Sequence, residues 1–251
     1  MDEKRQLRIR YRGNRSTIGL LLLVLLLGLL FAGCDQGSSD GVVPKPDLPK
    51  QLKTPGARST RPKIIALGDS LTAGFGLTEK ESFPFLLQQL IDKDGLDFEV
   101  VNAGVSGDTS LGGLERADWV LGQDNAKVLI LELGANDLLR AVPVEEMRKN
   151  LDAIIVKAKA KGMEVLLCGM LAPNTMGETY QREFVKVFPQ LADKHGVAFM
   201  PFILDGVALD KELNQPDGIH PNAKGEVIMT ANVYKELKPI LVKLTKASSK
   251  G

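Results

Sequence analysis

The stretch Lys63-Ile-Ile-Ala-Leu-Gly-Asp-Ser-Leu-Thr-Ala-Gly-Phe-Gly76 decides the fold predicted for this chain. It begins with a short apolar run, residues 64–67, which has the length of a buried parallel strand. The run breaks at Gly68-Asp69-Ser70, so a serine follows the carboxyl end of the strand. An α/β sheet presents a nucleophile at this position, but the same residues also form ordinary turns or helix N-caps. The rest of the chain decides between these two interpretations.

Short apolar runs alternate with amphipathic helical patterns from residue 62 onward. We expect strands at residues 63–67, 98–102, 128–133, 164–168 and 198–202. Helical faces lie between or after these runs, and they comprise Phe83, Leu86, Leu87, Leu90 and Ile91; Met147, Leu151, Ile154, Ile155 and Ala158; Phe184, Val187, Phe188 and Leu191; and, in a helix from about Asn222, Val227, Ile228, Ala231, Tyr234 and Leu237. This alternation predicts an α/β fold in which helices cover both faces of a parallel sheet.

A polar, glycine-rich cluster follows four of these predicted strands. The clusters are residues 68–70, 102–109, 134–137 and 217–221. Because the carboxyl ends of parallel strands lie at one edge of a sheet, we expect these clusters to meet where α/β proteins bind ligands. Together they supply a serine, two kinds of hydrogen-bond donor, a carboxylate and a histidine. This convergence is the strongest functional signal in the sequence.

Ser70 requires a base, because a serine hydroxyl is a poor nucleophile until its proton is removed. The chain has two histidines. His195 lies at a predicted helix end, where a cation suits the helix dipole, so we interpret it as structural. His220 follows Asp217 by three residues, so one loop supplies a base and the carboxylate that fixes its tautomer. The alternative is a solvated turn ahead of a helix that starts at Pro221.

Acyl transfer also requires donors aimed at the developing oxyanion. Gly107 has no side chain to block its backbone N–H, and Asn136 offers a side-chain amide. With the backbone N–H of Ser70 they would form a hole of three donors. The alternatives are a loop glycine and a turn residue. We expect Asp69 and Asp108 to order their loops rather than to react.

Four motifs together resemble the SGNH, or GDSL, hydrolases. They are Gly68-Asp-Ser-Leu71, Ser106-Gly-Asp-Thr-Ser110, Gly134-Ala-Asn-Asp137 and Asp217-Gly-Ile-His-Pro-Asn222. The resemblance covers about residues 62–245 and favours the bacterial group of thioesterase I, lysophospholipase L1 and arylesterase. It implies a flavodoxin-like three-layer α/β/α sandwich with strand order 2-1-3-4-5, and it implies no metal or cofactor. It also implies that Ser70, His220 and Asp217 form a catalytic triad, with Ser70, Gly107 and Asn136 as the oxyanion hole.

The expected activity is that of a serine esterase, which hydrolyses acyl esters or lysophospholipids through an acyl-enzyme. Apolar residues in the loops after the third and fourth strands are candidates for an acyl groove, and they are Leu138, Leu139, Val142, Met170, Leu171 and Pro173. Core packing is the alternative for each of them. Two other functions stay open: an O-acetyl esterase acting on envelope or extracellular glycans, and a non-catalytic binding lipoprotein.

The N-terminus has the pattern of an export segment. Residues 1–17 carry six basic and two acidic side chains, and residues 18–32 form an apolar run that is short for a membrane-spanning helix. Small residues before Cys34 resemble a bacterial lipobox, which predicts a signal peptide at 1–33, a lipidated Cys34, a flexible linker to residue 61, a domain at 62–247 and a tail at 248–251. An uncleaved anchor is the alternative, and both place the domain outside the cytoplasm. Asp35 resembles an inner-membrane retention signal, which would put the domain on the periplasmic side.

Charge and composition exclude several other classes of protein. The formal net charge is +1 and no basic stripe is present, so a nucleic-acid partner is not expected. Cys34 and Cys168 are the two cysteines, and their separation suggests neither a disulfide framework nor a metal cluster. Cys168 stands inside a predicted strand, where we expect it to be a buried packing residue. No Gly-x-Gly-x-x-Gly motif follows the first strand, which argues against a dinucleotide site.

Overall fold

The computed structural model describes residues 60–172 and 177–248. The predicted signal peptide, the linker up to residue 59, Cys34 and Pro173 lie outside the described residues. The domain boundaries predicted within residues 1–61 therefore stay predictions. None of the helices in the described ranges has both the length and the apolar character needed to cross a membrane.

Five parallel strands form one sheet: β1 (Lys63–Gly68), β2 (Glu99–Gly104), β3 (Ala126–Glu132), β4 (Glu164–Cys168) and β5 (Ala198–Met200). Their order is β2-β1-β3-β4-β5, as the resemblance implied. Each strand overlaps the range predicted for it, although β5 ends two residues earlier than expected. The predicted α/β class and strand order are therefore confirmed.

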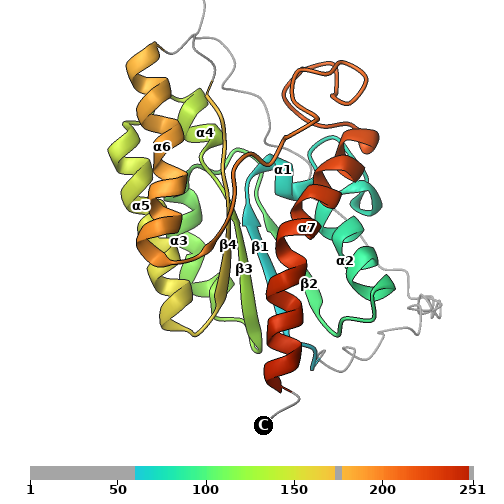
Figure 1. The fold of residues 1–251 in the computed structure, drawn as a ribbon. Coiled ribbons are helices and arrows are strands. Elements are labelled where there is room, and N and C mark those ends of the chain that lie inside the picture. Colours follow the sequence, from blue (N-terminus) through green and yellow to red (C-terminus); the bar gives the residue numbers. More distant parts are fainter. Residues whose placement is uncertain (1–59, 173–176, 249–251) are drawn as a thin grey trace, which may run out of the picture. The chain divides into compact units, whose positions relative to one another are not determined.

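Helices cover both faces of this sheet, which gives the predicted three layers (Figure 1). One face carries α3 (Ser110–Leu121), α5 (Val144–Ala160) and α6 (Glu178–His195). The other carries α2 (Phe83–Lys93) and α7 (Ala223–Ser248), which pack against each other. The short helices α1 (Ser70–Ala73) and α4 (Ala135–Leu139) and the 3-10 turn η1 (Glu79–Glu81) lie in the loops after β1 and β3.

The central strands form the core because both of their faces are buried. The side chains of β1 and β3 that are completely inaccessible include Ile64, Ile65, Leu67, Leu129, Ile130 and Leu131. Burial of each such side chain contributes about 1.5–3 kcal/mol relative to exposure. The predicted apolar faces of α5 and α6 are fully buried, and on α2 the side chains of Phe83, Leu87 and Ile91 are buried. The buried sheet therefore sets the position of the carboxyl end of each strand, where the next loop begins.

The predicted buried face of α7 is wrong in part: Leu237 is buried, and Ile228 and Tyr234 are half-buried and pack against the core, but the other two residues are exposed. Val227 is 57% exposed and Ala231 is also exposed, whereas Met229, Val233, Leu237 and Leu241 are buried. The physical reason is that two polar residues stand on the inner face, Glu226 and Thr230, each 1% exposed. These polar positions mask the apolar period, so the pattern of apolar residues alone selects a face rotated toward solvent.

The helices α1, α3 and α4 were not predicted. In α3 the buried positions include the small residues Gly113 and Ala117, whereas Trp119 is 78% exposed. A helix that buries small residues and exposes a large aromatic one has a weak apolar period, which explains why the pattern was missed. The helices α1 and α4, of four and five residues, are too short to show a period at all.

Candidate active site

Ser70 opens the one-turn helix α1 directly after β1. Asp69 accepts a hydrogen bond from the backbone N–H of Leu71 at 3.1 Å and so caps this helix. Gly68 ends the strand, and a Cβ atom at this position would overlap Thr72 Oγ1 and Glu132 Oε2. Gly74 ends the helix in the left-handed conformation, with φ of 75°. The sequence Gly68-Asp69-Ser70 therefore builds a tight turn that presents the serine at the carboxyl edge of the sheet.

His220 and Asp217 lie beside this serine. His220 Nε2 is 2.8 Å from Ser70 Oγ, and His220 Nδ1 is 2.7 Å from Asp217 Oδ2. The other oxygen of Asp217 accepts from the backbone N–H groups of Ile219 and His220 at 3.0 and 3.1 Å. The hydrogen bond with His220 is the main reason why the pKa of Asp217 is lowered, so this carboxyl is charged at neutral pH. The structure thus brings together three residues that the sequence separates by up to 150 positions.

Gln215 joins the histidine loop to the serine loop, and sequence reasoning missed it. Its Nε2 donates to the carbonyl of Phe75 at 2.7 Å and to that of Pro221 at 2.9 Å. Its backbone N–H also donates to the carbonyl of His220 at 2.8 Å. The ring of Phe75 packs on the imidazole of His220, with ring centroids 4.7 Å apart. Phe75 stands between two glycines, which could have marked it as a residue of the site. Nothing in the residue type of Gln215 pointed to its role.

Gly107 lies in the loop after β2. Its φ is 87°, which favours glycine, and its carbonyl accepts a hydrogen bond from Arg140 at 2.8 Å. Arg116 on α3 holds this loop to β1: its guanidinium donates to Asp108 at 2.6 Å and to the carbonyls of Ala103 and Gly68 at 2.7 and 3.0 Å. The same side chain therefore fixes the ends of β1 and β2, and Asp108 orders its loop as expected.

Asn136 lies on α4, in the loop after β3. Its Nδ2 donates to Asp69 Oδ2 at 3.0 Å, which places the amide beside the residue that precedes the serine. The next residue, Asp137, is completely buried and accepts from the backbone N–H and the hydroxyl of Ser110 at 2.7 and 2.6 Å. Asp137 thereby attaches α4 to the start of α3, which sequence reasoning did not foresee.

Two buried carboxyl groups contact the turn that carries Ser70: Asp69 precedes the serine, and Glu132 accepts from the backbone N–H of Asp69 and from Thr72 Oγ1. Asp69 and Glu132 are 0% and 1% exposed. Burial raises the pKa of Asp69 to about 6. Burial, followed by the charge of Asp69, holds the pKa of Glu132 well above its ordinary value. Sequence reasoning missed Glu132, which lies inside the strand predicted at 128–133; a glutamate in an otherwise apolar strand was the available signal.

The candidate acyl-groove residues differ in exposure. Leu138 and Met170 are each 7% exposed and belong to the core, as in the packing alternative. Leu139 is 64% and Leu171 50% exposed, and Val142 is half-buried. Contact of any of these residues with substrate stays a prediction.

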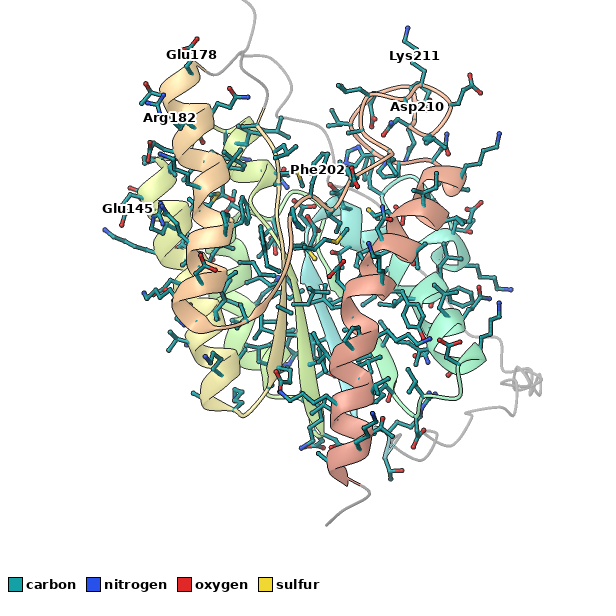
Figure 2. The ribbon with its side chains drawn as sticks, viewed as in Figure 1. Glu145, Glu178, Arg182, Phe202, Asp210 and Lys211 are labelled. Atoms are coloured by element: carbon teal, nitrogen blue, oxygen red, sulfur yellow. The ribbon has the colours of Figure 1, made fainter. Side chains whose placement is uncertain are left out.

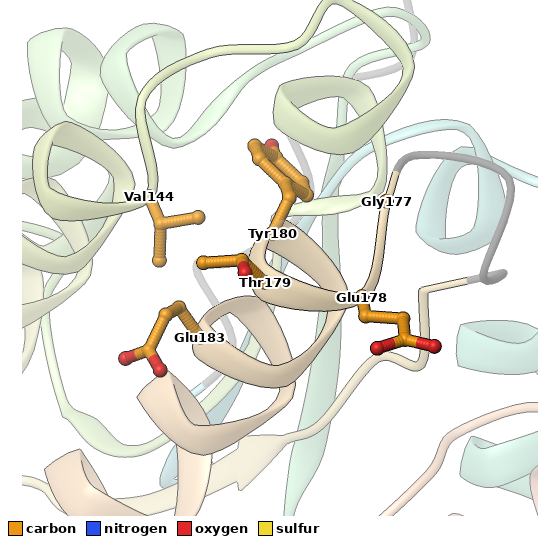
Figure 3. Close-up of a pocket in the computed structure, with 6 residues that line it drawn as sticks. All are labelled: Val144, Gly177, Glu178, Thr179, Tyr180 and Glu183. Atoms are coloured by element: carbon orange, nitrogen blue, oxygen red, sulfur yellow. The ribbon is translucent and has the colours of Figure 1, made fainter.

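An open pocket of about 720 Å³ lies near this region, at the starts of α5 and α6 (Figure 3). Its lining is Val144, Gly177, Glu178, Thr179, Tyr180 and Glu183. The Tyr180 hydroxyl donates to the carbonyl of Val142 at 2.9 Å. Figure 2 shows Glu178 at the same end of the domain as Asp210 and Lys211 of the loop before α7. The pocket therefore adjoins the segment that carries Val142, and neither Ser70 nor His220 lines it.

The contacts of two residues agree with a structural role. His195 ends α6, and its Nε2 is 2.6 Å from Asp152 Oδ1. Cys168 is 2% exposed, and burial raises the pKa of its thiol, which leaves it unreactive. Among residues 60–172 and 177–248, no group of three or more His, Cys, Asp and Glu side chains is arranged to hold a metal ion.

Known proteins resemble this chain in sequence. Residues 66–228 match the GDSL-like Lipase/Acylhydrolase family. The chain is 37% identical over 178 residues to the esterase TesA of Pseudomonas aeruginosa, which covers 71% of this chain and 89% of that protein. It is 35% identical over 178 residues to the thioesterase 1/protease 1/lysophospholipase L1 of Escherichia coli K12, which covers 71% of this chain and 84% of that protein.

Solved structures of esterases also resemble this chain in fold. The crystal structure of the psychrotrophic esterase EstA from Pseudoalteromonas sp., inhibited by monoethylphosphonate, matches with a TM-score of 0.69 at 34% identity. That match covers 72% of this chain and 98% of the other. Because the family match spans more than half of the chain and the relatives are covered over most of their length, this chain belongs to the GDSL-like lipase/acylhydrolase family, the SGNH hydrolases, and is a carboxylic ester hydrolase.

Proposed function

We propose that this esterase works through Ser70, His220 and Asp217 and a covalent acyl-enzyme. His220 Nε2 removes the proton from Ser70 Oγ as that oxygen attacks the acyl carbon. The protonated imidazole then gives its proton to the leaving alcohol or thiol, and water repeats the sequence to release the acid. Asp217 keeps the proton of the neutral imidazole on Nδ1 and stabilises the imidazolium. The single observation behind this proposal is the continuous pair of contacts at 2.8 and 2.7 Å.

We assign the oxyanion hole to the backbone N–H groups of Ser70 and Gly107 and to the side chain of Asn136. Negative charge develops on the acyl oxygen in the transition state, and fixed donors stabilise it there. Asn136 uses one N–H on Asp69, which leaves its second N–H for the oxyanion. Three strand ends supply these donors, so the hole is held by the sheet rather than by one flexible loop.

The substrate class that we favour is an apolar acyl ester, including lysophospholipids. Relatives named esterase and thioesterase 1/lysophospholipase L1 support the class. The exposed side chain of Leu139 follows Asn136 by three positions and is available to an acyl chain. Each methylene that the enzyme buries contributes about 0.8 kcal/mol, which would favour longer chains until the groove is full.

A substrate panel tests the activity and its class together. Purified wild-type domain is compared with Ser70→Ala on p-nitrophenyl esters of rising chain length, a lysophospholipid and acetylated sugars, and both proteins are incubated with a fluorophosphonate probe. We expect turnover and probe labelling in the wild type only, with kcat/KM rising with chain length. Labelling of Ser70→Ala would overturn the nucleophile. Acetylated sugars as the best substrates would replace the acyl-chain proposal by the glycan O-acetyl esterase.

We also propose that Cys34 carries a lipid that tethers the domain to the bacterial envelope, outside the cytoplasm. About 27 linker residues would span roughly 30 Å, at 5–6 Å times the square root of the residue number. Such a tether would bring the site to ester substrates at a bilayer surface. In a bacterial host, palmitate labelling of the wild type and its loss in Cys34→Ser test the anchor. An unlabelled wild type that keeps residues 1–33 would favour the uncleaved anchor.

A further inference from the structure

The two buried carboxyl groups below Ser70 form a connected pair. Glu132 ends β3 and Asp69 follows β1, and these two strands are neighbours in the sheet. Glu132 Oε2 accepts from Thr72 Oγ1 at 2.8 Å and from the backbone N–H of Asp69 at 3.2 Å. Gly68 makes this approach possible, because a Cβ atom at that position would overlap Glu132 Oε2. Gly68 thus ends β1 and also leaves room for the carboxyl group of Glu132 beside the turn that carries Ser70.

The other oxygen of Glu132 has no donor. Oε1 is buried, and no N–H or O–H group in the described part of the chain lies within hydrogen-bond distance of it. An ionised oxygen in this position would leave a buried charge without compensation, which costs several kcal/mol. A protonated carboxyl can instead donate, and the acceptor that we assign to it is the carboxylate of Asp69, the residue whose backbone N–H already bonds Glu132 Oε2. One proton shared by two buried acids also avoids two like charges in contact.

Asp69 connects Glu132 to the proposed oxyanion hole, because its carboxylate accepts a hydrogen bond from Asn136. Its Oδ2 accepts from Asn136 Nδ2 at 3.0 Å, and its Oδ1 accepts from the backbone N–H of Leu71 at 3.1 Å. A charged carboxylate only accepts, so it binds the NH2 end of the Asn136 amide. A protonated Asp69 could donate to the carbonyl end, and the amide would turn over. The turned amide would aim an oxygen at the developing oxyanion and repel it.

We propose that Glu132 is a positioning residue whose protonated carboxyl donates to Asp69, keeps Asp69 an acceptor, and thereby aims the Asn136 amide at the oxyanion. This inference rests on the proposed function, because it needs Asn136 as an oxyanion donor. Glu132 touches neither substrate nor the reacting atoms, and it acts through Asp69 and Asn136. Its effect therefore belongs to kcat, whereas a residue that only shapes the acyl site would change KM.

Two substitutions of Glu132 separate its hydrogen bonds from its volume. In Glu132→Gln, the amide oxygen accepts from Thr72 and the backbone of Asp69, while the amide N–H donates to Asp69. Glu132→Met fills a similar volume and makes none of these bonds. With a p-nitrophenyl ester we expect Glu132→Met to lower kcat by roughly 10- to 100-fold at nearly constant KM, up to the cost of a lost oxyanion donor. Glu132→Gln should recover most of that loss.

A double-mutant cycle with Asn136→Ala tests the route of the effect. If Glu132 acts through Asn136, the double variant Glu132→Met/Asn136→Ala should be hardly slower than Asn136→Ala alone. If the fold-losses in kcat of the two single variants multiply in the double variant, Glu132 acts independently of the Asn136 amide, and the inference is overturned. Thermal unfolding and circular dichroism of each variant confirm that it is folded.

Two further outcomes keep the inference separate from the proposed function. A loss of more than 10-fold in Glu132→Gln would show that Glu132 must be charged, and this isosteric variant decides the question if Glu132→Met does not fold. Ser70→Ala is assayed in parallel. Without Ser70-dependent turnover in the wild type, the proposed function fails. With such turnover and a Glu132→Met variant of wild-type kcat, only the positioning role of Glu132 fails.

Discussion

Two histidine–aspartate pairs in this molecule have nearly the same separation but use different ring nitrogens, Nδ1 in His220 and Nε2 in His195, and they have different surroundings. His220 and Asp217 are 2.7 Å apart, and His195 and Asp152 are 2.6 Å apart. The second nitrogen of His220 faces Ser70, whereas Asp152 shares its carboxylate with Lys194 at 2.7 Å. His195 ends α6, the helix that begins with Glu178 at the serine-loop end of the domain (Figure 2). The proposed base therefore differs from the structural histidine in its neighbour, a serine hydroxyl within hydrogen-bond distance of its second nitrogen.

Removal of the proposed nucleophile or of its proposed base should have the largest effect and should distinguish the two histidine–aspartate pairs most clearly. We expect Ser70→Ala and His220→Ala to lower kcat by roughly 10⁴–10⁶, because the members of a triad act as a unit. His195→Ala, the matched control, should keep most of the wild-type kcat. Steady-state kinetics with a p-nitrophenyl ester measure all three. An inactive, folded His195→Ala would show that the comparison is drawn wrongly.

Asn136 should come next in size. Asn136→Ala removes one donor from the proposed oxyanion hole, which should lower kcat by roughly 10²–10³ with little change in KM. Asn150→Ala is a suitable control, because Asn150 donates to the Ser110 hydroxyl at 3.0 Å and lies outside the proposed hole. An unchanged kcat in Asn136→Ala would reduce this residue to a turn former that anchors Asp69.

The acyl-chain preference should be a smaller effect. Leu139→Asp places a charge on the exposed side chain three positions after Asn136, so the rise of kcat/KM with chain length should flatten while acetyl esters are spared. The expected loss is up to about fourfold for each methylene that no longer finds an apolar contact, from 0.8 kcal/mol per methylene. Leu209→Asp, on a side chain that is 93% exposed, is the control. Parallel chain-length profiles for wild type and Leu139→Asp would exclude this side of the site as the groove.

The smallest effect should belong to the structural pair. Burial opposes ionisation of Asp152, but hydrogen bonds from Lys194 and His195 outweigh it and lower the pKa of this carboxyl. A lowered pKa means that the pair stabilises the fold above the unfolded-state value near 4, and that this contribution disappears as pH falls through the folded-state value. Asp152→Asn should reduce the free energy of unfolding by under about 1 kcal/mol at pH 7 without changing kcat. Urea titrations at pH 7 and pH 2.5 measure the difference, which should be smaller at the lower pH.

The sequence predicted much of the sheet and of the site because both follow short-range rules. Apolar runs of strand length identified five strands, and the polar turns after them contain Ser70, His220 and Asp217, which the fold brings together. Residue type and spacing made His220 and Asp217 candidates because they stand three positions apart in one loop, and the resemblance to the SGNH hydrolases implied their roles.

The remainder could not be predicted because it depends on contacts between distant segments. Gln215 has no distinctive neighbours in sequence, and its role follows from reaching Phe75 across 140 positions. Glu132 resembles an interruption in a strand until its contacts with Thr72 and Asp69 are known. On α7, Glu226 and Thr230 are buried by their packing, which a rule based on apolar residues assigns to the outside.

The bridge from Gln215 to Phe75 has a consequence for how this protein folds. Local pairing of β1 with its neighbours can begin early, but contacts separated by 140 and 150 positions require closure of the largest loops in the domain. Closing such loops costs chain entropy and slows folding. Ser70 can therefore stand on a formed sheet before His220 arrives beside it. Recovery of esterase turnover during refolding should therefore report when the loop with Gln215 and His220 docks on the turn that carries Ser70. It should lag behind fluorescence or circular dichroism signals that follow the sheet and helices.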